Sequence, residues 1–282
     1  MDGLDKLTVP RLRKMKAGGE KITMVTAYDY PSALLADRAG IDMLLVGDSL
    51  GMVVLGYPNP VQVTVDDIVH HTRPVARAVK RALVVADMPF MSYHVSREQT
   101  VSNAARLIQE GGADAVKLEG GKQMAPTVKE IVDVGIPVQA HIGLMPQRAS
   151  VGDTFKVQGK TAETAQAILE DALALEAAGA FSVVLEFVTA EAAQLITELL
   201  EMPTIGIGSG AGCDGQVLIL HDLLGVYDQA PPFVKPYADL NKVITEALIG
   251  YRDDVRSARY PGEEYTVHME SGEARKLKKV RG

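Results

Sequence analysis

Short apolar runs rich in β-branched residues alternate along this chain with longer stretches whose apolar residues recur at helical spacing. This alternation is typical of βα units that build a parallel sheet. Several of the short runs are apolar almost throughout, as expected for strands that are covered on both faces. The predicted strands are Ile22–Asp29, Met43–Ser49, Leu83–Pro89, Ala115–Gly120, Pro137–Leu144, Phe181–Val188, Pro203–Gly210 and Phe233–Tyr237.

The stretches between these strands carry signals of helix ends. Thr64, with Asp67 three residues later, predicts a capped helix start, and Ser96 predicts another before the next helix. The stretch Thr161–Ala178 consists mostly of strong helix formers, and Gly179 predicts its end.

Eight strands at about 30 residues per βα unit favour a closed (β/α)8 TIM barrel. We expect one barrel domain at residues 1–258, including an N-terminal extension, and a polar C-terminal tail at residues 259–282. An open doubly wound sheet has the same alternation of elements and is the alternative fold. The tail includes the basic run Arg275–Lys279. Such a run favours a solvated or disordered segment over a specific anion site.

The composition narrows the class of protein. Of 282 residues, 47% are hydrophobic and 23% are charged, which is ordinary for a globular protein. The net charge of −7 weighs against a nucleic-acid or anionic-membrane partner. The single cysteine, Cys213, excludes an internal disulfide framework. We find no apolar run of membrane-spanning length and no signal-peptide pattern, so we expect a cytoplasmic protein.

Three carboxylates follow neighbouring predicted strands: Asp48, Asp87 and Glu119. In α/β barrels the active site lies at the carboxyl ends of the strands, so these acids are expected to converge. Such a cluster repels itself unless a cation binds or a proton is shared. Oxygen ligands without Cys or His suit a hard ion, Mg²⁺ above all. Each acid taken alone can instead form an Asx turn or a helix cap, and that alternative stays open.

Three other residues on predicted strands are candidates for chemistry. Lys117 lies two positions before Glu119 on the same strand, so both side chains point to the same side. A buried lysine needs an anionic partner, which is either a carboxylate of the protein or one of a substrate. Glu186 ends an apolar strand and is either a general base or an ion-pair partner. His141 lies within the predicted fifth strand, and its ring N–H can donate a hydrogen bond to a developing oxyanion.

Two further patterns predict no separate site. Residues 210–215 fit a dinucleotide-binding fingerprint between a strand and an expected helix, but they follow the seventh strand in a glycine-rich region. We expect a turn that gives a ligand room at the barrel mouth. The remaining histidines form no metal motif, because two are adjacent on a helix and three lack convergent partners: His70, His71, His94, His221 and His268.

A series of segments in this order resembles the ketopantoate hydroxymethyltransferase family. The resemblance runs from about Leu7 to Tyr260, nearly the whole chain, and a series of this length is far more specific than any single motif. The segments are Val9–Arg13, Thr26–Asp29, Val46–Gly51, Ala86–Phe90, Val116–Gly121, His141–Gln147, Lys156–Gly159, Asp171–Gly179 and Gly206–Gln216.

The resemblance implies a barrel of the phosphoenolpyruvate/pyruvate type and an enzyme of pantothenate biosynthesis. Such an enzyme transfers a hydroxymethyl group from 5,10-methylenetetrahydrofolate to 3-methyl-2-oxobutanoate, giving 2-dehydropantoate through a Mg²⁺-stabilised enolate. Members of the family are usually large homo-oligomers, commonly decamers.

The resemblance also implies a role for each candidate residue. Asp48, Asp87 and Glu119 match the Mg²⁺ positions, and Ser49 and Lys117, with Asp48 and Asp87, match the keto-acid-binding positions. Glu186 matches the proton acceptor. A role for His141 near the keto oxygen or the folate is a further hypothesis.

Two other functions remain as alternatives. The first is a carboligase or lyase of the phosphoenolpyruvate/pyruvate type, although Cys213 in the glycine-rich turn does not provide the cysteine-bearing loop of such lyases. The second is a non-catalytic keto-acid binding protein. Glu186 argues against that function, because binding alone needs no base.

Overall fold

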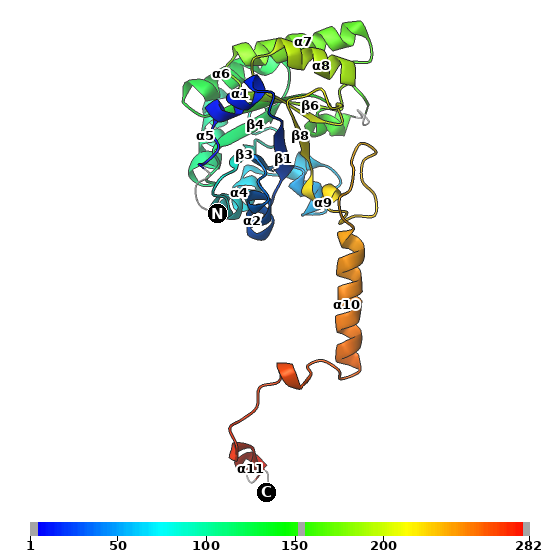
Figure 1. The fold of residues 1–282 in the computed structure, drawn as a ribbon. Coiled ribbons are helices and arrows are strands. Elements are labelled where there is room, and N and C mark those ends of the chain that lie inside the picture. The colour runs from blue at the N-terminus through cyan, green and yellow to red at the C-terminus, as the bar shows by residue number, and fades with distance from the viewer. Residues whose placement is uncertain (1–4, 152–155, 279–282) are drawn as a thin grey trace.

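Eight parallel strands close into a barrel in chain order, with β1 paired to β8, in a computed structural model that describes residues 5–151 and 156–278 (Figure 1). The predicted barrel is therefore confirmed, and the open-sheet alternative is wrong. The strands are β1 (Ile22–Thr26), β2 (Met43–Val46), β3 (Leu83–Asp87), β4 (Ala115–Glu119), β5 (Val138–Gly143), β6 (Ser182–Glu186), β7 (Thr204–Ile207) and β8 (Gly215–Leu218).

Helices surround this barrel and extend the chain beyond it (Figure 1). The longer ones are α1 (Val9–Ala17), α2 (Tyr30–Arg38), α4 (Val65–Ala78), α5 (Arg97–Gln109), α6 (Ala125–Asp133), α7 (Ala162–Ala177), α8 (Ala190–Leu199) and α10 (Leu240–Arg256). The short ones are α3 (Leu50–Val53), η1 (Pro60–Gln62), η2 (Lys122–Met124), η3 (Pro146–Val151), α9 (Leu220–Leu223), η4 (Glu263–Tyr265) and α11 (Glu273–Lys278).

The helix ends that the sequence predicts are present. Thr64 and Asp67 form a reciprocal capping box at the start of α4, and the Ser96 side chain accepts a hydrogen bond from the Gln99 backbone N–H. Gly179 follows α7 with a φ of 98°, a conformation that favours glycine. These local signals fix where the helices begin and end because their partners lie within one helical turn.

Two apolar layers hold the barrel together. The larger layer lies between the strands and the surrounding helices, and it includes Leu44, Val84 and Leu118. The smaller layer fills the barrel interior, where Met24 and Met43 pack with Leu12 of α1. Helix α1 thus closes the amino ends of the strands, which leaves the carboxyl ends as the open face.

The eighth strand differs from the prediction. The strand that closes the barrel is Gly215–Leu218, and Phe233–Tyr237 forms no strand. A Cβ at Gly215 would lie 2.4 Å from the backbone oxygen of Ile22, so only glycine allows β8 to approach β1 this closely. Glycine weakens the strand signal in a sequence, whereas the apolar run at 233–237 produces a false one.

The glycine-rich segment also differs from the prediction. It leads into β8 rather than into a helix, and residues 208–214 connect β7 to β8 without one. Its last part lies at the amino ends of the strands, where Asp214 pairs with Lys16 of α1 at 2.7 Å. Only its first residues lie near the mouth: a Cβ at Gly208 would touch the rings of Phe187 and Phe233 at 3.0–3.1 Å.

Helix α10 projects away from the barrel, and none of its residues is buried (Figure 1). The predicted polar tail contains η4 and the short helix α11, where we expected no regular structure. Lys279, the end of the basic run, lies outside the described residues, and the domain boundary at residue 258 stays a prediction. Across the described ranges, the structure has no helix long and apolar enough to cross a membrane.

Candidate active site

The predicted site residues gather in one cavity of about 300 Å³ at the carboxyl ends of the strands. Strand β3 ends at Asp87 and strand β4 at Glu119, while Asp48 lies in the turn after β2. All three carboxylates are buried, with 1–6% of their surface exposed. The neighbouring strands thus bring together acids that the sequence separates by 39 and 32 positions.

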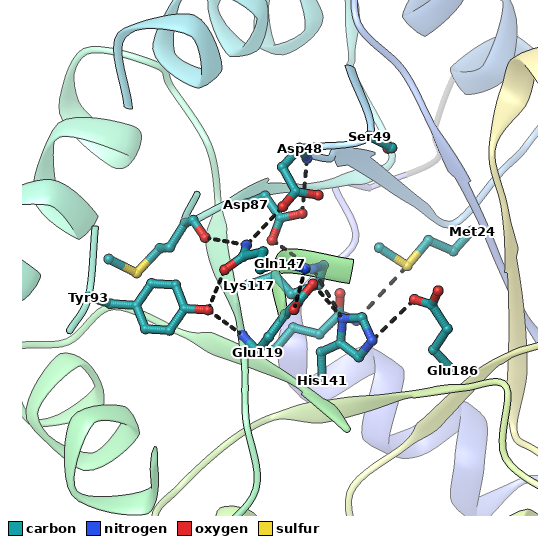
Figure 2. Close-up of polar contacts among 12 residues, drawn as sticks. Met24, Asp48, Ser49, Asp87, Tyr93, Lys117, Glu119, His141, Gln147 and Glu186 are labelled. Atoms are coloured by element: carbon teal, nitrogen blue, oxygen red, sulfur yellow. Dashed lines mark hydrogen bonds and ion pairs between the residues drawn. The ribbon is translucent and has the colours of Figure 1, made fainter. Parts of the chain in front are cut away.

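Lys117 supplies the positive charge of the cluster. Its ammonium nitrogen lies 2.7 Å from Asp87 Oδ1, and the side chain is as buried as the acids around it (Figure 2). Asp87 also accepts a hydrogen bond from the Asp48 backbone N–H at 3.1 Å. Lys117 therefore has a protein carboxylate as a partner, and a substrate carboxylate would be a second one.

Gln147 connects two of the three carboxylates. Its side-chain amide donates to Asp48 Oδ2 at 2.8 Å and to the Met88 carbonyl at 3.0 Å, and its backbone N–H donates to Glu119 at 3.2 Å. The Tyr93 hydroxyl donates to the Gln147 amide oxygen at 2.6 Å. Gln147 thus orients both acids, and the orientation of its own amide is set by Tyr93.

His141 lies between Glu119 and Glu186 (Figure 2). Its Nε2 is 3.1 Å from Glu186 Oε2 and 2.9 Å from the Leu144 carbonyl, while Nδ1 is 3.6 Å from Glu119 Oε1. Because the Leu144 carbonyl can only accept, Nε2 carries a proton and donates it to that carbonyl, and the Glu186 carboxylate lies in contact with the same nitrogen. This geometry supports a positioning role for His141, and the predicted role as an oxyanion donor stays a prediction.

Glu186 differs from the other carboxylates in its surroundings. It ends β6 and lines the cavity, and 16% of its side chain is exposed. Ser49 lines the same cavity, and its hydroxyl is 2.8 Å from the hydroxyl of buried Tyr28. The base candidate and the hydroxyl candidate are therefore both accessible to a molecule in the cavity.

Burial dominates the electrostatics of the acids. Desolvation, followed by the charge of Asp87, raises the pKa of Asp48 to about 7. Desolvation and the charge of Asp48 raise the pKa of Glu119 well above its usual value. Although burial opposes it, Asp87, Glu119 and Asp48 together raise the pKa of Lys117. One ammonium group does not balance three buried acids, so without a further cation the cluster retains protons.

A divalent cation would take the place of these protons as the balancing positive charge. Asp87 Oδ1 is buried and makes its ion pair with Lys117 but no hydrogen bond of good geometry among the described residues. In the same part of the chain, no three His, Cys, Asp or Glu side chains are arranged to hold a metal ion together, and this includes Asp48, Asp87 and Glu119. Mg²⁺ is usually bound through one or two carboxylates, with water and substrate oxygens completing its shell. The donor set therefore suits an open Mg²⁺ site.

Sequence reasoning missed the supporting residues. Gln147 lies in η3 and Tyr93 lies between β3 and α5, so neither residue has a strand-end signal. Tyr28 lies within a segment that carried the family resemblance, but nothing local shows that it contacts Ser49. Two of the five other histidines pack on these tyrosines: the His94 ring lies 4.2 Å from that of Tyr93, and the His221 ring 5.5 Å from that of Tyr28.

Comparison with solved structures supports the fold alone. Phosphoenolpyruvate phosphomutase from Streptomyces platensis superposes with a TM-score of 0.60 at 15% identity, covering 98% of this chain and 97% of that one. A 2,3-dimethylmalate lyase of the phosphoenolpyruvate mutase/isocitrate lyase superfamily superposes with a TM-score of 0.59 at 16% identity, covering 97% and 98%. These neighbours have the same barrel fold as this chain.

Sequence comparison is much closer. A 3-methyl-2-oxobutanoate hydroxymethyltransferase from Moorella thermoacetica is 57% identical, covering 93% of this chain and 97% of the relative. One from Heliobacterium modesticaldum is 54% identical, covering 94% and 96%. The sequence model of the ketopantoate hydroxymethyltransferase family matches residues 6–263. The resemblance inferred from the sequence is thus confirmed, and the chain belongs to the ketopantoate hydroxymethyltransferase family.

Proposed function

We propose that this chain transfers a hydroxymethyl group from 5,10-methylenetetrahydrofolate to 3-methyl-2-oxobutanoate, giving 2-dehydropantoate for pantothenate biosynthesis. One observation carries the proposal: an accessible carboxylate, Glu186, faces a buried cluster of three acids and a lysine in one cavity. An accessible base beside a cluster that can hold a divalent cation and a keto acid is what enolate chemistry requires.

Glu186 is the proposed proton acceptor. It takes the proton from C3 of the keto acid, and His141 keeps its carboxylate oriented through the 3.1 Å contact. The electron pair left on C3 delocalises into the keto group as an enolate. C3 then bonds to the methylene carbon of the folate, whose C–N bonds to N5 and N10 break. Water supplies the hydroxyl oxygen, and the C3 proton and one water proton end on the two nitrogens of the tetrahydrofolate that leaves.

The other residues hold the keto acid in place for this step. Lys117 and Ser49 are proposed to bind its carboxylate and to aim C3 at the base. Asp48, Asp87 and Glu119 are the residues that would hold Mg²⁺, through direct or water-mediated contacts. When bound, Mg²⁺ supplies positive charge beside the keto oxygen, a contribution of several kcal/mol to enolate formation.

The decisive assay is formation of 2-dehydropantoate from the two proposed substrates with Mg²⁺ present. Hydrogen exchange at C3 of 3-methyl-2-oxobutanoate in D₂O separates the remaining possibilities. A non-catalytic binding protein would show no exchange, and a lyase would show exchange without consuming methylenetetrahydrofolate. The lyase alternative draws support from fold similarity only, at 15–16% identity.

We also propose that the chain forms a homo-oligomer, as the family resemblance implies, with a decamer as the expected state. The exposed apolar side chains of α10 support self-association, because an interface between subunits would remove this apolar surface from water. A cytoplasmic location and the absence of nucleic-acid and membrane partners remain predictions, which cell fractionation would test.

A further inference from the structure

The cavity has two unlike halves. Its inner half is the polar cluster described above, at the ends of β2 to β6. Its outer half is formed by chain that follows β8, where Ile219, Pro231, Phe233 and Val234 present apolar surface with Asp222 among them. The residues proposed to hold the keto acid all lie in the inner half, which leaves the outer half for the second substrate.

The outer half lies beside the proposed base. Phe233 packs on Phe187 with 5.4 Å between ring centroids, and Phe187 directly follows Glu186. Gly208 makes this contact possible, because a Cβ there would meet both rings at 3.0–3.1 Å. A ligand held on Phe233 is therefore adjacent to the point where the C3 proton is removed.

Asp222 is the charged group of this outer half. Its side chain lines the cavity and is half-buried, and burial raises its pKa. Within residues 5–151 and 156–278, its carboxylate makes no hydrogen bond and no ion pair. A partly desolvated carboxylate without a protein partner is stabilised by a ligand that donates hydrogen bonds to it.

We propose that the outer half binds the pterin ring of the folate donor, with Asp222 accepting hydrogen bonds from its 2-amino group and N3–H. These two donors lie side by side on a planar ring edge and match the two oxygens of a carboxylate, as a guanidinium does. Phe233 and Pro231 cover the ring face. This inference rests on the proposed function, because it assigns a place to that reaction's second substrate.

The test compares Asp222→Asn with Asp228→Asn, an exposed acid six residues later that does not line this cavity. Equilibrium dialysis measures tetrahydrofolate binding, with 6-methyltetrahydropterin and p-aminobenzoylglutamate as competing fragments. In Asp222→Asn we expect tetrahydrofolate and the pterin fragment to bind about 10- to 100-fold more weakly, the loss typical of a charged hydrogen bond. Asp228→Asn should bind both as the parent does.

A second readout separates this proposal from damage to the inner half. Deuterium exchange at C3 of the keto acid, measured without folate, should stay within about two-fold of the parent in Asp222→Asn, since a change below ~0.4 kcal/mol is small against the expected loss. Unchanged pterin binding in this variant overturns the inference. So does a loss of exchange that parallels the loss of binding, or weaker binding of p-aminobenzoylglutamate alone. If instead the parent exchanges C3 hydrogen but binds no tetrahydrofolate, the proposed function itself fails.

Discussion

At the residue scale, the buried acids depend on a small number of fixed donors. An ionised carboxylate that leaves water loses several kcal/mol of solvation unless hydrogen bonds or charges replace it. Asp87 has Lys117 and the Asp48 N–H, and Asp48 has the Gln147 amide. Because these donors are positioned before any ligand arrives, the site needs little rearrangement to bind one.

The Glu186→Gln variant separates binding from proton removal. The amide keeps the shape of the side chain but cannot accept the C3 proton, so turnover should fall ~10²-fold or more. Binding of Mg²⁺ and the keto acid should be nearly unchanged by calorimetry, and C3 exchange should fall as much as turnover. Glu191→Gln, at an exposed acid in the first turn of α8, is the matched control. Parental exchange in Glu186→Gln would move the base to another residue, with His141 tested first.

Gln147→Met tests whether the amide supports the carboxylates. The substitution keeps an extended side chain but removes the donor to Asp48 and the acceptor of Tyr93, both buried. We expect the free energy of unfolding to fall by about 1–3 kcal/mol, and Mg²⁺ affinity to change with it. Denaturant unfolding and calorimetry measure the two effects. Gln194→Met, at an exposed position of α8, is the control and should change the free energy of unfolding by no more than about 0.5 kcal/mol. An equal change in both variants would contradict the supporting role of the Gln147 amide.

At the element scale, β8 shows that a strand can be specified by the absence of a side chain. Gly215 pairs with both Ile22 of β1 and Ile205 of β7, so the barrel closes at a glycine. The following segment, with α9, then returns along the mouth and forms the outer half of the cavity. The closure of the barrel and the formation of the outer half of the cavity therefore depend on the same part of the chain, β8 and the segment that follows it.

Gly215→Ala should destabilise the barrel. The added Cβ meets the Ile22 oxygen at 2.4 Å and Ile205 Cδ1 at 2.8 Å, so the backbone must shift, at a cost of about 1–3 kcal/mol. Gly250→Ala is the control, because a Cβ there meets nothing within 4 Å and glycine weakens a helix. That variant should gain about 0.5–1 kcal/mol. Equal melting temperatures for Gly215→Ala and the parent would show that β8 does not need glycine.

At the scale of the whole molecule, α10 is the element that the barrel leaves without a partner. Its exposed apolar residues include Val243 at 59%, Leu248 at 62% and Tyr251 at 59% exposure. Apolar surface gathered on one projecting helix is typical of an association surface. The proposed homo-oligomer would cover it.

Leu248→Glu tests this arrangement. A charge placed in an apolar interface is costly to desolvate, so sedimentation velocity should show smaller species than the parent at equal concentration. The barrel should stay folded by circular dichroism, because no residue of α10 is buried in it. Thr245→Glu, which adds the same charge at a polar position of the helix, is the control. A parent that sediments as a monomer, or a variant that assembles normally, contradicts a role for α10 in assembly.

The sequence by itself determined the class of fold and the acids of the site. Strand and helix periods are local properties, so seven of the eight strands and the capped ends of α4 and α5 could be predicted from neighbouring residues. Strand ends in a barrel meet at one face, so Asp87, Glu119 and Glu186 could be placed at a common site from their positions alone.

Only the tertiary structure decided which residues complete that site. Gln147 contacts Asp48 across 99 positions of sequence, and Tyr93 contacts Gln147 across 54. Likewise, glycine is needed at position 215 only because a Cβ there would lie 2.4 Å from the Ile22 oxygen of β1. Asp222 lines the cavity only because the segment after β8 runs along the mouth of the barrel. Such partners come from separate elements, and no local pattern records a contact that exists only after the barrel has closed.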